Sequence, residues 1–148
     1  MDIDAQPPVL VLHGPNLNLL GTREPEAYGK TTLAELDASL VALGQQLGVR
    51  VTCEQHNGEG ALIDALHRAR TFAGVLVNPA GYTHTSVAVR DALAALECPK
   101  IEVHLSNIHA RESFRHTSIT AGACDGVVAG LGPESYRLAL RHLAALAT

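Results

Sequence analysis

The chain has 148 residues, of which 47% are hydrophobic and 18% are charged, and its formal net charge at pH 7 is -4. This length fits a single domain built around one hydrophobic core. The negative net charge argues against nucleic-acid binding, which requires a basic surface, and no apolar run approaches the roughly 20 residues that span a bilayer.

The cysteines and the first residues bear on the compartment in which the protein works. The three cysteines are isolated, odd in number and never arranged as C-x-x-C, which disfavours a disulfide framework or a zinc site. The N-terminus, MDIDAQPP, is acidic and polar, unlike a signal peptide. We therefore predict a cytoplasmic protein, and we expect residues 1–7 to be a flexible segment.

The chain begins with a predicted strand that is followed by an unusually long loop. Residues 8–13, PVLVLH, form a short continuous apolar run, which is typical of a strand buried on both faces. The next residues, GPNLNLLGTREPEAYG, contain proline, asparagine and glycine where a helix would otherwise begin. Ordinary connections run to about 4–6 residues, so a loop of this length calls for a functional explanation.

The rest of the chain alternates helical patterns with short apolar strands. Thr32 and Glu35 have the spacing of a capping box, in which each side chain accepts a backbone N–H at the start of a helix, and leucines at helical spacing continue to Gly48. Pro133 fits the first position of a final helix, where its missing N–H costs nothing. The other predicted strands span residues 49–55, 74–78, 100–105 and 126–130, and the other predicted helices span 61–72, 86–96 and 133–146.

Five apolar strands alternating with helices predict one α/β domain over residues 1–148, with a parallel sheet covered by helices on both faces. Because crossovers between parallel strands are right-handed, we expect the doubly wound, flavodoxin-like strand order 2-1-3-4-5. In such sheets ligands bind beyond the carboxyl ends of the strands, between strands one and three, where the winding direction changes.

Polar side chains gather at the predicted carboxyl ends of the strands. Strand one ends in HGPN, strand two in QHN, strand three in NPAGYTH and strand four in HLSN, whereas proline and glycine mark the amino ends. This segregation predicts a small-molecule site with several hydrogen-bonding side chains and few carboxylates.

Glu102 and His104 lie two residues apart in a predicted strand, so their side chains share one face of the sheet. They could form a structural ion pair, but at the ligand-binding end of the sheet we favour a carboxylate that orients an acid–base histidine. Taken singly, His13, His56 and His109 are more simply explained as loop or core histidines than as catalysts.

Two arginine-containing patterns are ambiguous when each is taken alone. Arg111 and Arg115, four residues apart, fit a solvated helix face or, together with the other polar residues, an anion or polyol site. Arg23 would favour the phenolate of Tyr28, because tyrosine has a reference pKa of about 10 and arginine stays charged. Closure of the 17–30 loop as a lid would bring both over a ligand and exclude water, although exposed Arg and Tyr are common in loops.

Four stretches of the chain resemble the type II 3-dehydroquinate dehydratases of the shikimate pathway. They are GPNLNLLGTREPEAYG, the NGEG of residues 57–60, NPAGYTHTSVAVRDAL and EVHLSNIHARESFRHTS, and the resemblance extends in order over almost the whole chain. It implies a hydro-lyase that converts 3-dehydroquinate to 3-dehydroshikimate by anti elimination through an enolate, with no cofactor and no metal.

The resemblance also implies catalytic roles for five residues. Tyr28 would take the C2 proton, with Arg23 keeping it ionised. Asn16 would stabilise the enolate oxygen through an ordered water. His104, oriented by Glu102, would protonate the departing hydroxyl.

Substrate-binding residues follow from the same motifs. The carboxylate of the substrate would be held by Asn78, by Ser106 and by the backbone N–H groups of Leu105 and Ser106. The groups that hold the ring hydroxyls would be His84, Arg115 and, from a neighbouring subunit, Asp91. Arg111 belongs to the same motif and would shape the site.

The resemblance further implies a homo-oligomer, a dodecamer built as a tetramer of trimers, with no nucleic-acid or membrane partner. Three places depart from the usual family pattern. His13 stands where asparagine is frequent, His56 stands where a small hydroxyl residue is usual after the glutamine, and the order Pro79-Ala80-Gly81 replaces a frequent P-G-A. Ala80 matters more, because glycine tolerates backbone conformations that alanine does not.

Two other classes of protein compete with this interpretation. A flavodoxin-like module that binds a flavin or nucleotide would open its first helix with a Gly-, Ser- or Thr-rich phosphate turn, but this chain has a Pro-Asn loop there and no Trp to stack on a flavin. A metal-dependent hydrolase built on His104 and His109 would call for a helical H-x-x-x-H or a compact carboxylate cluster, and the sequence has neither.

Overall fold

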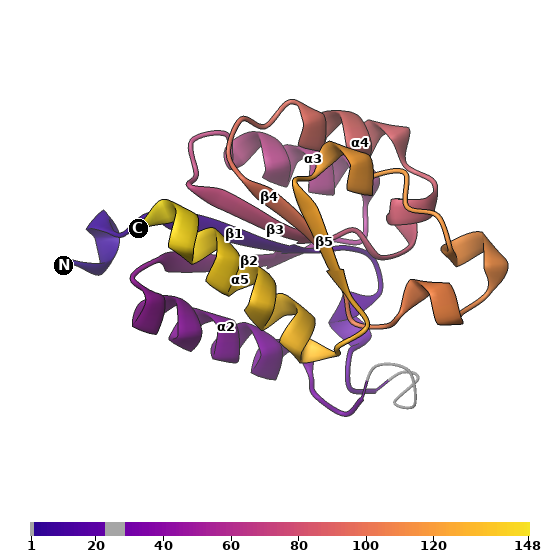
Figure 1. Cartoon of the computed structure of the whole chain (residues 1–148), viewed down its shortest axis with the longest axis horizontal. Coiled ribbons are helices and arrows are strands. Elements are labelled where there is room, and N and C mark those ends of the chain that lie inside the picture. Colours follow the sequence, from indigo (N-terminus) through magenta and orange to yellow (C-terminus); the bar gives the residue numbers. More distant parts are fainter. Residues whose placement is uncertain (1, 23–28) are drawn as a thin grey trace.

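The structure, a computed structural model, describes residues 2–22 and 29–148. Its centre is a five-stranded parallel sheet with the predicted order β2-β1-β3-β4-β5 (Figure 1). The strands are β1 (Pro8–His13), β2 (Arg50–Gln55), β3 (Gly74–Asn78), β4 (Lys100–His104) and β5 (Gly126–Ala129).

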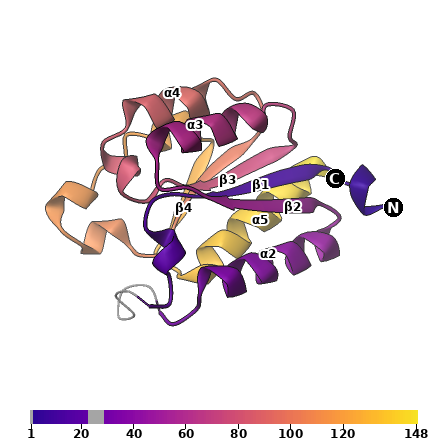
Figure 2. The ribbon, with the colours of Figure 1, turned by 180° about the vertical axis from the view of Figure 1, so that it is seen from behind.

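Two α-helices cover each face of the sheet, as Figures 1 and 2 show from opposite sides. One pair is α2 (Leu33–Leu47) and α5 (Pro133–Ala147), and the other is α3 (Glu59–Arg68) and α4 (Val87–Ala94). The side chains of β1 alternate between the two cores: Val9 and Val11 pack on the side of α2 and α5, while Leu10 and Leu12 face α3 and α4. Because both of its faces are buried, β1 is a continuous apolar run.

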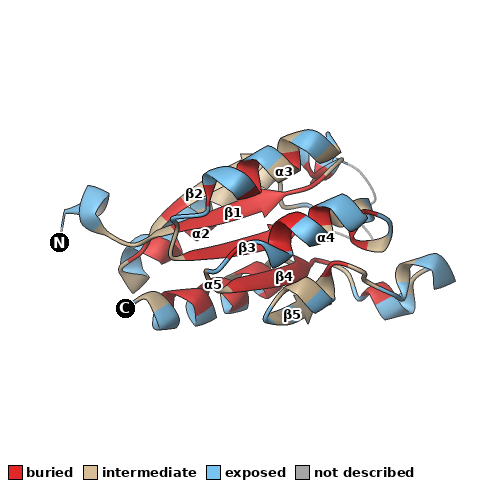
Figure 3. Cartoon of the chain, turned by 90° about the horizontal axis from the view of Figure 1, so that it is seen from above, coloured by how far each residue is buried: buried red, intermediate tan, exposed pale blue. Residues whose placement is uncertain are grey.

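The central strands are far more buried than the edges (Figure 3). Every residue of β3 and β4 is buried, whereas no residue of β5 is fully buried. Polar side chains on the central strands therefore need hydrogen-bond partners inside the protein. Asn78, Glu102 and His104 are all in this position.

The ends of α2 follow the sequence signals, with one difference. The Thr32 hydroxyl accepts the Glu35 N–H (3.2 Å), and Gly48 ends the helix in the left-handed region at φ 84°. The Glu35 carboxylate, however, accepts the Thr32 hydroxyl (3.1 Å), so the reciprocal half of the predicted capping box is wrong. The Val49 N–H bonds the Gly44 carbonyl in this helix end (2.9 Å), so β2 begins one residue later than predicted.

Two other predicted segments needed correction. Helix α3 starts at Glu59 because the Gly58 carbonyl already accepts the Leu62 N–H (3.1 Å), and it ends at Arg68 rather than at residue 72. The stretch between β4 and β5, for which the sequence predicted no helix, contains two short 3-10 helices, Ile108–Ala110 and Ser113–Arg115. Within the described residues, every helix is too short or too polar to cross a membrane.

Candidate active site

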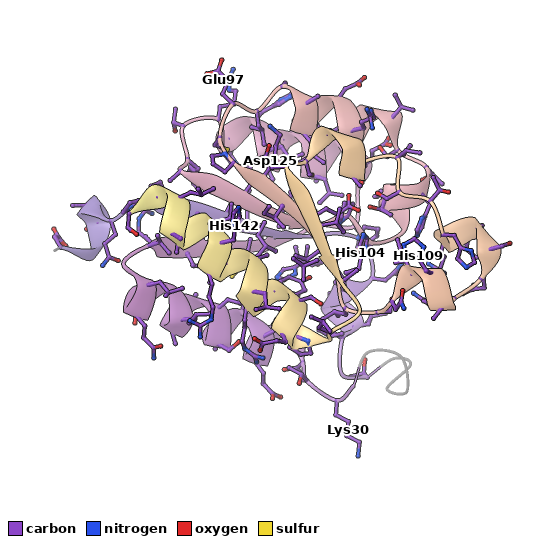
Figure 4. All side chains as sticks on the ribbon, viewed as in Figure 1. Lys30, Glu97, His104, His109, Asp125 and His142 are labelled. Atoms are coloured by element: carbon purple, nitrogen blue, oxygen red, sulfur yellow. The ribbon has the colours of Figure 1, made fainter. Side chains whose placement is uncertain are left out.

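A pocket of about 150 Å³ lies at the carboxyl ends of the central strands. A water molecule needs roughly 15 Å³ of such space, so this volume corresponds to on the order of ten waters and fits a small organic molecule. Eight of the predicted site residues line the pocket: Asn16, Asn78, His84, His104, Leu105, Ser106, Arg111 and Arg115. Figure 4 shows His104 on the side of the molecule opposite the first residues of the chain.

Of the other four predicted residues, Glu102 and Asp91 are described and do not line the pocket. Glu102 lies behind His104 as its hydrogen-bond partner. Asp91 is exposed on α4 and is not among the residues that line this cavity of its own chain. Arg23 and Tyr28 lie outside the described residues.

The described residues on either side of the 23–28 segment come together beside the pocket. A Cβ atom added to Gly21 would lie 3.0 Å from the Lys30 carbonyl oxygen, so the two flanks are neighbours. Leu20, next to Gly21, lines the pocket, as do Leu17 and Leu19 of the short 3-10 helix η2 (Leu17–Leu19). The described residues on either side of positions 23–28 therefore lie near the rim of the pocket.

Glu102 and His104 form a buried pair, as their spacing predicted. The His104 Nε2 atom lies 2.9 Å from the Glu102 Oε2 atom, and the two side chains are 6% and 0% exposed. Burial opposes ionisation of Glu102, but hydrogen bonds from His104, Thr120 and Ser118 outweigh it and lower the pKa of the carboxyl below its usual value. An ionised carboxylate only accepts hydrogen bonds, so Nε2 carries a proton and Nδ1 is the ring nitrogen left for a ligand.

The hydroxyl groups that surround Glu102 were not predicted. Ser118 donates to Glu102 Oε2 (2.7 Å), Thr120 donates to Oε1, and the Thr83 hydroxyl lies 2.8 Å from that of Thr120. Ser118 and Thr120 lie in the segment between β4 and β5, and Thr83 follows β3. No local periodicity marks such residues, because only the folded topology brings the three segments together.

Asn78 is held at both ends of its side-chain amide. Its Oδ1 atom accepts the Ala80 N–H (3.0 Å), and its Nδ2 atom donates to the Tyr136 hydroxyl (3.0 Å). Ala80 has φ 54°, a left-handed conformation that costs a non-glycine residue about 1–2 kcal/mol. The sequence departure at Ala80 thus coincides with real backbone strain at the wall of the pocket.

Asn16 also has a left-handed backbone, with φ 71°, which asparagine tolerates better than most residues. Its N–H donates to the Asn57 Oδ1 atom (3.0 Å), and Gln55 Nε2 donates to the same oxygen (3.0 Å). The end of β2 thereby positions Asn16, whose own side chain is exposed and lines the pocket.

The charged groups of the pocket favour an anionic ligand. Arg111 and Arg115 both line it, and none of the described residues in its lining is acidic. Just outside, Glu112 accepts from Arg115 Nε (3.1 Å). The His84 Nδ1 atom lies 2.9 Å from the Thr117 carbonyl oxygen, so Nδ1 carries the proton and Nε2 is free to accept a hydrogen bond.

The cysteines contribute no nucleophile to this chemistry. All three are free, and burial raises the pKa of each thiol, that of Cys124 to about 12. A thiol with a raised pKa is not ionised at neutral pH, and the thiolate is the reactive form. Among the described residues, no three or more His, Cys, Asp or Glu side chains are arranged to hold a metal ion.

Comparison with known proteins matches this chain to one family. Residues 7–144 match the family described as dehydroquinase class II. The 3-dehydroquinate dehydratase of Ruegeria pomeroyi is 55% identical over 138 residues, which cover 93% of this chain and 93% of the relative. The 3-dehydroquinate dehydratase 2 of Pseudomonas aeruginosa is 56% identical over 137 residues, which cover 92% of this chain and 93% of the relative.

Solved structures that are similar to this chain belong to the same family. The type II dehydroquinase from Butyrivibrio crossotus superimposes with a TM-score of 0.92 and 41% identity, covering 93% of this chain and 97% of the other. The type II dehydroquinase from Propionibacterium acnes gives a TM-score of 0.91 and 45% identity, covering 93% and 96%.

Proposed function

Because the chain belongs to the class II dehydroquinase family, it is a hydro-lyase that dehydrates 3-dehydroquinate, and we propose that the pocket beyond β3 and β4 carries out this reaction. The observation that carries the proposal is the buried Glu102–His104 pair at the wall of a cation-lined pocket. The family assignment favours this activity over a flavin- or nucleotide-binding module.

The reaction removes the C2 proton, forms an enolate and expels the hydroxyl on the opposite face as water. We assign the base to Tyr28 and the cation that favours its phenolate to Arg23. The proximity of Gly21 and Lys30, which stand on either side of Arg23 and Tyr28 in the sequence, supports this assignment, because Leu20 beside Gly21 lines the pocket. The 17–30 loop would then act as a lid, and exclusion of water would strengthen the pairing of the two side chains.

We assign the second half of the reaction, protonation of the departing hydroxyl, to His104. Its Nδ1–H, in the imidazolium form, would give its proton to the departing hydroxyl, which leaves as water. Glu102 would stabilise the imidazolium and hold the ring in place, as an orienting carboxylate does in other acid–base sites. Asn16, held over the pocket by Asn57, would stabilise the enolate oxygen.

The remaining residues would bind the substrate. Asn78, Ser106 and the backbone N–H groups of Leu105 and Ser106 form the proposed cradle for the carboxylate, and the absence of acidic groups from the described lining supports it. His84 and Arg115 would hold ring hydroxyls, and Arg111 would shape the site. None of these roles requires a cofactor or a metal.

We also propose a cytoplasmic homo-oligomer, a dodecamer made of trimers. Asp91 supports this, because it is exposed on α4 and does not line the pocket of its own chain, so it would complete the pocket of a neighbour. Sedimentation equilibrium should give twelve times the mass of one chain. A monomeric mass with full activity would contradict the shared site.

The experiment follows product formation directly. Chelator-treated protein is mixed with 3-dehydroquinate, and the ultraviolet absorbance of the conjugated enone product is recorded. The rate should scale with protein and fall by at least about 10²-fold in Tyr28→Phe, since a general base contributes typically 10²–10⁴-fold. The matched control is Tyr82→Phe, which removes a hydroxyl that bonds only the Asn57 carbonyl oxygen. Near-normal turnover in Tyr28→Phe would refute the base.

A further inference from the structure

A chain of three hydrogen bonds runs through the core to Asn78. The Asp37 Oδ1 atom lies 2.7 Å from His13 Nε2, the His13 Nδ1 atom lies 3.0 Å from the Tyr136 hydroxyl, and that hydroxyl lies 3.0 Å from Asn78 Nδ2. His13 and Tyr136 are both fully buried. The chain joins α2, β1, α5 and β3, which meet only in the folded protein.

The direction of every hydrogen bond in this chain follows from its two ends. The Asp37 carboxylate accepts, so His13 Nε2 carries a proton, and in the neutral ring Nδ1 is then an acceptor. Tyr136 must then donate its O–H to Nδ1, which leaves its oxygen to accept from Asn78 Nδ2. Burial raises the pKa of Tyr136, so the hydroxyl keeps the proton that this arrangement requires.

These hydrogen bonds hold the side-chain amide of Asn78 in one orientation. Its oxygen is occupied by the Ala80 N–H and one of its two Nδ2 protons by Tyr136. The other Nδ2 proton is the only one left for a ligand, and Asn78 lines the pocket. A flipped amide would set its oxygen against the Tyr136 oxygen and its Nδ2 protons against the Ala80 N–H.

We propose that Tyr136 and His13 are positioning residues for the dehydration, which hold the Asn78 amide so that one N–H faces the carboxylate of the substrate. This rests on the proposed role of Asn78. Two polar side chains buried in an apolar core are costly unless their hydrogen bonds are complete, and well-packed apolar residues would fill the same space without that requirement. Fixing a binding group in advance lowers the entropy lost when a ligand binds.

Tyr136→Phe removes one oxygen atom and tests the proposal by separating KM from kcat. If Asn78 holds the carboxylate equally in ground and transition states, its misalignment raises KM and leaves kcat nearly unchanged. We expect KM to rise about 5- to 20-fold, the range for weakening a hydrogen bond to a charged group, and kcat to change less than about threefold. Unchanged KM would overturn the proposal.

Ser135→Ala is the matched control on the same helix. Ser135 is also fully buried, and its hydroxyl accepts the Leu131 N–H (3.0 Å) without contacting the chain of hydrogen bonds. Both variants should lower the melting temperature, but only Tyr136→Phe should raise KM. Equal KM values in the two variants would mean that Tyr136 only stabilises the fold.

A double-mutant cycle with Asn78→Ala tests whether Tyr136 acts through Asn78. In the Asn78→Ala background, Tyr136→Phe should add no further change in KM, whereas in the wild type it raises KM. If the fold-changes in KM of the two single variants multiply in the double variant, the proposal is overturned.

The hydrogen-bond direction has a test that does not depend on turnover. Long-range proton–nitrogen NMR correlations of the wild-type protein should show His13 protonated at Nε2 and unprotonated at Nδ1. A proton on Nδ1 would overturn the proposal even if the enzyme is active. If the wild type does not convert 3-dehydroquinate, the proposed function fails, and this measurement still decides the arrangement around Asn78.

Discussion

The same three-residue pattern, Glu-x-His, occurs at the ends of two strands in very different surroundings. In β4 the pattern is Glu102-Val-His104, and at the end of β2 it is Glu54-Gln-His56, in which His56 directly follows the strand. Both histidines place Nε2 2.9 Å from the carboxylate. The β4 pair is nearly inaccessible, whereas Glu54 and His56 are 27% and 29% exposed. The distance between the groups therefore does not distinguish them.

The partners of the two carboxylates do distinguish them. Glu54 also accepts from Arg68 (2.7 Å), so a permanent cation already satisfies it. Glu102 accepts from the neutral hydroxyls of Ser118 and Thr120, so His104 is the one described hydrogen-bond partner of Glu102 that can carry a positive charge. A carboxylate with neutral donors gains more from protonation of its histidine, which is what a general acid requires. Burial and neutral partners, rather than the pattern, therefore support the proposal that the β4 pair is the catalytic one.

The largest expected contrast comes from removing each carboxylate charge. Glu102→Gln should lower kcat on the order of 10²-fold, because the imidazolium of His104 loses its stabilising charge and general acid catalysis supplies about 10²–10⁴-fold. Glu54→Gln, the matched change on β2, should leave kcat within about twofold, because an exposed pair contributes little. Steady-state kinetics with 3-dehydroquinate measures both. Equal kcat values in the two variants would show that the Glu102 and Glu54 carboxylates do not differ in their contribution to catalysis.

A smaller contrast comes from removing one donor to each carboxylate. Thr120→Val deletes a hydroxyl bonded to Glu102 and should lower kcat about 3- to 10-fold, the effect of one buried hydrogen bond. Arg68→Ala deletes the cation beside Glu54 and should not change kcat. A kcat as high as the wild-type value in Thr120→Val would show that the hydroxyls only fill the core.

The smallest expected difference is in stability at low pH. The pKa of Glu102 lies below its ordinary value of 4.5 in the folded state. The unfolded state therefore binds more protons as the pH falls, so the contribution of Glu102 to stability is complete above the unfolded pKa and is lost as the pH falls through the folded pKa. The free energies of unfolding of the wild type and Glu102→Gln, measured with urea, should be compared between pH 5.5 and pH 3. Below about pH 4.5 the wild type should lose stability relative to the variant, and a constant difference from pH 4.5 down to pH 3 would contradict this.

Much of the fold was predictable because its signals are local. The apolar run of β1 and the strand β3 have the predicted bounds, and Gly48 ends α2 as expected. The errors lie at element ends, where tertiary contacts compete with local preference. Val49 looked like the start of β2, but its N–H is used by the end of α2.

The candidate site divides in the same way. Glu102 and His104 were found because residues two apart share one face of a strand, and the strand-end residues followed from the sheet topology. The donors to Glu102 and the Tyr136–His13 contact join segments 16, 18 and 123 residues apart, and no pattern in the chain records them. Arg23 and Tyr28 stay predictions, since they lie outside the described residues.

The most direct test of the account is the kcat of His104→Ala set beside that of His56→Ala, both measured at saturating 3-dehydroquinate. The account predicts that His104→Ala loses about 10²–10⁴-fold, since it removes the general acid, while His56→Ala stays within about twofold because its pair is a partly exposed ion pair. Circular dichroism should show both variants folded. A His104→Ala enzyme with kcat close to that of His56→Ala would contradict the assignment of the β4 pair as the catalytic one.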